Sequence, residues 1–203
     1  MASPMNAGVQ NAWEQLAALK SCDVCRNATA TFDAAPGCFT IRSFGRDIFV
    51  SLKDRTVAVP APMPGGLSGE YSELFPLAVL WYLVLAKDIA PTGRLIRLED
   101  LRGGDIFAKG SHVMPLEMLA ERYGNDKEEF LKAGLAHGGV AVKLADAAVR
   151  LAPLPRLPVT VTLWLADEEF PARAGILFDS TCGLQLPTDI LWSLARLSCL
   201  ALL

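Results

Sequence analysis

The chain lacks a long uncharged apolar run and an excess of charge of one sign, and these absences argue against two classes of protein. Its longest uncharged apolar stretch, residues 74–86, is shorter than the roughly 20 residues that a membrane-spanning helix needs. The 19 basic and 22 acidic residues are interspersed and leave a net charge of −3, so no basic surface for a polyanion is indicated. We therefore expect neither membrane insertion nor nucleic-acid binding.

Catalytic motifs are also scarce. There are two histidines, neither in an HExxH arrangement, and no GxSxG nucleophile motif occurs. The glycine pairs at 65–66, 103–104 and 138–139 lack the Lys-Ser/Thr ending of a phosphate-binding loop and are more typical of turns. The first residues show neither the basic region nor the apolar region of a secretory signal, so we expect a cytoplasmic protein.

What the chain does contain is enough apolar sequence for a full core. It has 203 residues, of which 52% are hydrophobic, and this predicts a single domain spanning residues 1–203. Residues 60–70, rich in proline and glycine, are where an internal hinge would lie. The five cysteines, an odd number in a chain expected in the cytoplasm, indicate free thiols or a metal site rather than disulfides.

Hydrophobic periodicity predicts an α+β fold with an N-terminal antiparallel meander, a buried central helix, a helical middle and a C-terminal strand pair plus helix. The expected helices are 8–20, 72–87, 112–123, 127–136 and 187–203, and the expected strands are three within 38–58, then 95–98, 147–152, 157–165 and 176–178. The central helix is apolar on all sides and must lie between layers. The C-terminal helix could be core or a dimer face, and core is the favoured interpretation.

The acidic turn between the last two expected strands is one candidate site. Asp167, Glu168 and Glu169 follow the first strand and Asp179 ends the second, so the carboxylates would gather at one end of the pair. Clustered carboxylates can hold a divalent metal or form an acid/base pair. Strand alternation would place Asp167 and Glu169 on one side and Glu168 on the other. The ordinary interpretation is a solvated acidic turn.

The aromatic residues around this turn have an expected structural role. Trp164, Phe170 and Phe178 flank the acidic residues, and we expect them to fix the strand pair to the core.

Three cysteines form the sharpest spacing in the chain. Cys22 and Cys25 stand three residues apart, and Cys38 follows thirteen residues after Cys25. They would supply three of the four thiolate ligands that zinc or an iron–sulfur cluster requires. A fourth ligand would have to come from elsewhere, with candidates Cys182, Cys199, His112 and His137. The alternative is that these cysteines behave as small hydrophobic residues.

Several segments together resemble a known family. They are the sequences WLADEEFP at 164–171, ILFD at 176–179, LWYL at 80–83, PTG at 91–93, LRGG at 101–104 and the glycine pair at 138–139. In this order they resemble domain of unknown function 3786. The resemblance implies an auxiliary role near anaerobic corrinoid, iron–sulfur or one-carbon chemistry, because members occur mainly in anaerobic bacteria and archaea and some resemble fusions to a small iron–sulfur module. It implies no activity.

Three functional hypotheses follow. The leading one is a non-catalytic binding or accessory protein with a pocket between the central helix and the 159–180 strand pair, and with a small molecule, a cofactor or a protein as its partner. The second is a metal-dependent enzyme that uses Asp167, Glu168 and Asp179. The third is a zinc or iron–sulfur protein that uses Cys22, Cys25 and Cys38. Oligomeric state is left open.

Overall fold

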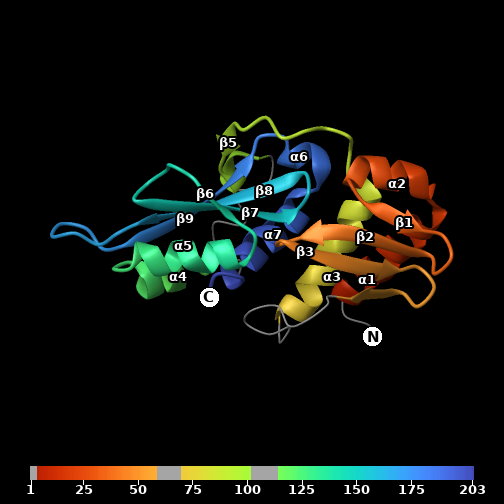
Figure 1. The fold of residues 1–203 in the computed structure, drawn as a ribbon, viewed down its shortest axis with the longest axis horizontal. Helices are drawn as coiled ribbons and strands as arrows, with labels where there is room; N and C mark the ends of the chain where they lie inside the picture. Colours follow the sequence, from red (N-terminus) through yellow and green to blue (C-terminus); the bar gives the residue numbers. More distant parts are fainter. Residues whose placement is uncertain (1–3, 59–69, 102–113) are drawn as a thin grey trace.

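The computed structural model describes residues 4–58, 70–101 and 114–203, and it confirms the predicted α+β class (Figure 1). The described chain forms two antiparallel sheets, one of four strands and one of five, with helices packed against them. A single cluster of buried apolar side chains runs through both halves of the molecule. The hinge predicted near 60–70 falls on residues 59–69, which lie outside the described residues.

The N-terminal half contains two helices and the first sheet. These elements are α1 (Pro4–Ala18), α2 (Ser21–Ala28), β1 (Thr31–Asp33), β2 (Cys38–Ser43), β3 (Arg46–Ser51) and β4 (Thr56–Ala58). The strands follow one another in the order β1-β2-β3-β4. The predicted meander is therefore present with one additional strand, β1, whose three residues are too few to show period-two alternation in the sequence.

The first sheet is fastened to the second by its β2–β3 turn. Phe44 and Gly45 form a two-residue turn with φ angles of 46° and 74°, the pattern of a type I′ hairpin. The Phe44 N–H donates to the Ala152 carbonyl at 2.9 Å. A Cβ on Gly45 would lie 2.9 Å from the Gly138 Cα, so both glycines are required for this close backbone approach.

The C-terminal half is built on the five-stranded sheet. Its strands are β5 (Leu95–Ile96), β6 (Val140–Ala141), β7 (Ala147–Leu154), β8 (Leu157–Trp164) and β9 (Arg173–Asp179). They pair in the order β5-β9-β8-β7-β6, with every pair antiparallel. The predicted strand at 176–178 is longer than expected and begins three residues earlier.

Three helices cover one face of the five-stranded sheet: α4 (Leu116–Tyr123), α5 (Lys127–Ala136) and α7 (Thr188–Leu200). The other described elements of this part are α3 (Glu70–Leu85), the short α6 (Cys182–Gln185) and a 3-10 turn, η1 (Leu98–Asp100). α4 packs on β9, α5 on β7 and α7 on β7 and β8, while α3 lies between α1 and α7. The buried central helix and the core position of the C-terminal helix are confirmed.

No helix in the described part of the chain is both long and apolar enough to span a lipid bilayer.

Candidate ligand-binding cleft

The register of the β8–β9 hairpin separates the carboxylates that the sequence predicts at one end of the strand pair. Trp164 pairs with Arg173 at the turn end, and Val159 pairs with Phe178 at the other end. Asp167 therefore lies in the connecting loop at one end of β9, whereas Asp179 is the last residue of β9 at its other end, and this seven-residue strand alone spans about 20 Å at about 3.3 Å per residue. The expectation that the four carboxylates gather at one end of the strand pair was wrong, because the end of the second antiparallel strand lies beside the start of the first.

The loop carboxylates point into solvent. Asp167, Glu168 and Glu169 are exposed, and the Asp167 Oδ1 accepts hydrogen bonds from the Phe170 N–H at 2.7 Å and the Glu169 N–H at 2.9 Å. Both hydrogen bonds lower the Asp167 pKa, and the bond from Phe170 has the larger effect. The strand alternation expected for these residues does not apply, since β8 stops at Trp164 and they form a turn.

Only one of the three flanking aromatic residues belongs to the core. Phe178 is fully buried, whereas Trp164 is 38% exposed and Phe170 is 60% exposed. The expectation that all three fix the hairpin to the core was therefore wrong for Trp164 and Phe170. Trp164 projects from the side of the sheet opposite the helices, where the Arg173 guanidinium stacks on its ring at 5.5 Å.

The three N-terminal cysteines are not brought into one ligand group. Cys22 and Cys25 lie on α2, and Cys38 begins β2, where its thiol contacts the Phe39 carbonyl at 3.5 Å. Burial and the neighbouring Cys22 raise the pKa of the Cys25 thiol. Within residues 4–58, 70–101 and 114–203, no group of three or more His, Cys, Asp or Glu side chains is arranged to hold a metal ion. Cys22 and Cys25 are neighbours on α2, but Cys38 belongs to β2 and does not complete a ligand group with them in the part of the chain that the structure describes.

Asp179 occupies a different environment, buried at the end of β9. Its carboxylate accepts from the backbone N–H groups of Gly93 at 2.6 Å, Thr92 at 3.1 Å and Thr181 at 3.0 Å, and from the Thr181 hydroxyl at 2.8 Å. Burial alone would raise the Asp179 pKa, but the hydrogen bonds from Thr181, Thr92 and Gly93 outweigh it and lower the pKa. The ionised carboxylate thus fastens the segment at 92–93 to the sheet.

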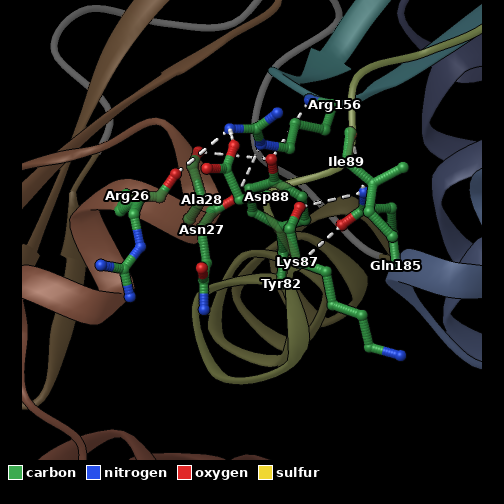
Figure 2. Close-up of polar contacts among 9 residues, drawn as sticks. All are labelled: Arg26, Asn27, Ala28, Tyr82, Lys87, Asp88, Ile89, Arg156 and Gln185. Atoms are coloured by element: carbon green, nitrogen blue, oxygen red, sulfur yellow. Dashed lines mark hydrogen bonds and ion pairs between the residues drawn. The ribbon is translucent and has the colours of Figure 1, made fainter.

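A second buried polar side chain fastens the residues just before that segment (Figure 2). Gln185 on α6 accepts from the Lys87 N–H at 2.8 Å and donates to the carbonyls of Lys87 at 3.2 Å and Ile89 at 3.1 Å. Gln185 and Asp179 together hold the irregular chain from 87 to 93 at both ends. This segment is fixed without forming a helix or a strand of its own.

Arg156, in the turn between β7 and β8, connects the same region to the N-terminal half (Figure 2). Its side chain donates to the carbonyl of Asn27 at 2.7 Å and to that of Arg26 at 3.2 Å, and it forms an ion pair with Asp88. Its backbone N–H donates to the Tyr82 hydroxyl at 3.1 Å. Burial raises the Tyr82 pKa, so this hydroxyl stays protonated and donates to the backbone of α2.

A cleft of about 580 Å³ lies on the face of the five-stranded sheet opposite the helices. Val149 faces α5, since a Cβ on Gly134 would lie 2.4 Å from it, so its neighbour Arg150 must face the other way. Arg150 pairs across the strands with Thr160, and both line the cleft. The walls come from the fastened segment at 91–95 and from Val142 and Leu144.

The chemistry of the cleft is that of an apolar site with one cation. Pro155, Pro158 and Leu144 contribute apolar lining. Arg150 is exposed and has no ion-pair partner among the described residues, and the Asp179 carboxylate at the edge is occupied by its hydrogen bonds. An unpaired guanidinium beside an apolar wall favours a ligand with a carboxylate or phosphate group and an apolar body.

This cleft is not where the sequence placed the pocket. The space between α3 and the strand pair is filled by α7, which contacts both α3 and β8. Arg150 could have been found as the one charged residue in the apolar run of β7. Gln185 and the 91–93 segment carried no such signal, because their importance arises from contacts between distant parts of the chain.

Searches of curated proteins and of solved structures each found no match to this chain. A family model described as a domain of unknown function (DUF3786) matches residues 22–201. Two of the segments that carry the resemblance are in contact here, since Asp179 of the ILFD sequence accepts hydrogen bonds from Thr92 and Gly93 of the PTG sequence. Because the match extends over most of the chain, the protein belongs to the DUF3786 family.

Proposed function

We propose that this protein is a non-catalytic binding protein whose cleft on the five-stranded sheet holds a small anion with an apolar body. The observation that carries the proposal is the Arg150 guanidinium, which has no ion-pair partner among the described residues and lies in an apolar-walled cleft of about 580 Å³. A cavity of this size falls in the range of about 300 to 1,000 Å³ that is usual for small-molecule sites.

Two features support binding rather than catalysis. A guanidinium is a permanent cation that donates hydrogen bonds, and the oxygens of Asp179 accept hydrogen bonds from Thr92, Gly93 and Thr181. The described lining therefore supplies a fixed charge and a shaped wall rather than a group that transfers protons. The wall at 91–95 is pre-organised by Asp179, which lowers the entropic cost of binding.

The test is a thermal unfolding screen with short linear carboxylic acids and phosphate monoesters. A ligand at 100 times its Kd should add about 2.7 kcal/mol to the free energy of unfolding. Arg150→Leu should abolish the stabilisation, whereas Lys132→Gln, which removes an exposed positive charge from α5, should leave it unchanged. The proposal fails if no compound stabilises the protein, or if Arg150→Leu binds as well as the parent protein.

The remaining functional predictions rest on the sequence and the family resemblance. These are an auxiliary role near corrinoid or iron–sulfur cofactor metabolism, a cytoplasmic location and the absence of nucleic-acid binding. Elemental analysis and an absorption spectrum of protein purified without oxygen test the first of them. Bound cobalt or iron with a matching visible spectrum would support the cofactor link, and a metal-free, colourless protein would count against it.

A further inference from the structure

A groove of about 650 Å³ lies between α4 and the β8–β9 hairpin, at the end of β9 remote from Asp179. Its floor includes the small apolar residues Ala120, Ala172 and Ala174. Glu117 and Glu121, one helical turn apart, extend along the α4 side. The groove therefore combines an apolar floor with a row of carboxylates at its rim.

The hairpin is held rigidly against α4. The Ala166 N–H donates to the Gly124 carbonyl at 3.0 Å. A Cβ on Gly124 would lie 2.3 Å from the Ala172 Cβ and 2.5 Å from the Ala120 carbonyl oxygen, so the two backbones meet where only glycine fits. The groove is thus a fixed shape and not a gap between loosely packed elements.

Beyond the groove, the hairpin tip projects from the body of the molecule (Figure 1). The tip is ordered by Asp167, which accepts from the N–H groups of Glu169 and Phe170 and whose own N–H donates to the Phe170 carbonyl at 3.0 Å. This turn presents the Phe170 ring 60% exposed beside three carboxylates. A rigid exposed aromatic residue is a typical anchor of a protein interface.

The charges of this surface are predominantly negative. Five carboxylates border the groove and form the tip, namely those of Glu117, Glu121, Asp167, Glu168 and Glu169. None of the five forms an ion pair within the described residues. Arg173 also lines the groove, where its guanidinium stacks on Trp164 and its charge partly offsets that of Asp167, and the nearby Arg122 stacks on Tyr123. The five carboxylates outnumber these two cations, so the surface offers net negative charge around an apolar floor.

We infer that the groove and the hairpin tip bind a basic segment of a protein partner that carries apolar side chains. The apolar floor would receive the apolar side chains, and the carboxylates would attract the basic ones. Nucleic acids and anionic membranes would be repelled by the same charges. This inference is independent of the proposed ligand cleft, which lies at the opposite end of β9.

A synthetic peptide provides the probe. It has about 15 residues, long enough for a helix to form, with lysine and leucine at helical spacing. Two relatives serve as comparisons, one with serine in place of leucine and one with glutamate in place of lysine. We expect the first peptide to bind in fluorescence anisotropy, with an affinity that falls as salt rises, and to shift the backbone amide NMR signals of α4 and the hairpin. Both relatives should bind at least about 10-fold more weakly.

Matched variants locate the site. Glu117→Gln with Glu121→Gln, and separately Phe170→Ser, should each weaken binding about 10-fold. Ala166→Phe, at an exposed position, should block the groove without changing its charge. Glu14→Gln with Glu73→Gln removes two exposed carboxylates elsewhere and should change affinity less than about twofold.

Three results would overturn the inference: equal binding by the groove variants, equal binding of the serine-containing peptide, or a concentration-dependent dimer that buries the groove. The last result would make a second copy of this chain the occupant. The Arg150→Leu variant should bind the peptide normally, so the failure of the ligand cleft and the failure of this inference can be told apart.

Discussion

The two ends of β9 carry carboxylates in opposite physical situations. At one end Asp179 is buried and accepts hydrogen bonds from two segments of the chain, and at the other Asp167 is exposed and organises only its own turn. The sequence shows both as acidic residues next to a strand. Their difference comes from what packs around each end: the 91–93 segment covers Asp179, while the Asp167 turn extends into solvent.

This comparison indicates how the molecule divides its surfaces. At its end of β9, Asp179 holds the 91–93 segment that forms a wall of the cleft, so its carboxylate is already hydrogen-bonded within the protein. The Asp167 end leaves its carboxylates and Phe170 available for contacts. A buried, fully hydrogen-bonded charge and an exposed one therefore have different uses even when a single short strand joins them.

Removing each of the two carboxylates in turn should give the largest difference in stability between the two ends of β9. Asp179→Ala should lower the free energy of unfolding by about 3 kcal/mol, because the N–H groups of Thr92, Gly93 and Thr181 lose their acceptor. Asp167→Ala should leave the urea midpoint nearly unchanged, since water replaces the lost contacts. Equal effects of the two substitutions in urea unfolding would show that the ends are not different.

The Asp167 end should instead be sensitive to backbone packing. Gly124→Ala should destabilise the protein by about 2 kcal/mol, because the added Cβ would meet the Ala172 Cβ at 2.3 Å and the Ala120 carbonyl oxygen at 2.5 Å. Gly8→Ala in α1 is the matched control. There the nearest atom lies at 3.4 Å, and the change should stabilise by about 0.5 to 1 kcal/mol. A neutral Gly124→Ala would mean that the hairpin is not seated tightly on α4.

Gln185 tests whether the cleft wall is fixed at both ends. Gln185→Leu should cost on the order of 1 to 2 kcal/mol, because it removes the partners of Lys87 and Ile89. Hydrogen exchange should become faster at residues 87–95 and stay unchanged at the hairpin tip. The surface variant Gln15→Leu should alter neither. Uniform acceleration over the whole chain would indicate global destabilisation and not local loosening of the wall.

His137 provides the smallest effect and sharpens the contrast with Asp179, because it is buried with an unsatisfied ring nitrogen. Within the described residues its Nδ1 has no hydrogen-bond partner. Burial, the larger cause, and the nearby positive charge of Arg46, the smaller one, lower the His137 pKa below its usual value of about 6.5. The unfolded state therefore binds more protons below pH 6.5, and stability falls as the pH decreases.

The size of the effect can be measured by unfolding at pH 7.0 and below. The free energy of unfolding should fall by at most about 1.4 kcal/mol per pH unit as the pH drops below about 6.5. His137→Gln should remove this part of the pH dependence while Asp179→Asn should leave it. A His137→Gln profile identical to that of the parent protein would assign the pH dependence to other groups.

Much of the fold could be predicted because hydrophobic periodicity is a local property. The apolar stretch at 74–86 required a buried helix, and the alternation at 38–52 required strands, and both are present. β1 was not predicted, because its three residues are too few to show an alternating pattern.

The candidate sites were predicted less well than the fold. Arg150 is visible in the sequence as a lone charge in a strand, but nothing local indicates which face of that strand the helices cover.

The sequence by itself determined the α+β class, the burial of the central and C-terminal helices, and the presence of an acidic turn between two strands. Tertiary structure alone decided which polar groups meet. Antiparallel pairing carried Asp179 away from Asp167, and the return of residues 87–93 along the sheet gave Asp179 and Gln185 their partners. The physical reason is that burial patterns depend on neighbours along the chain, whereas hydrogen-bonded sites depend on segments that meet only after folding.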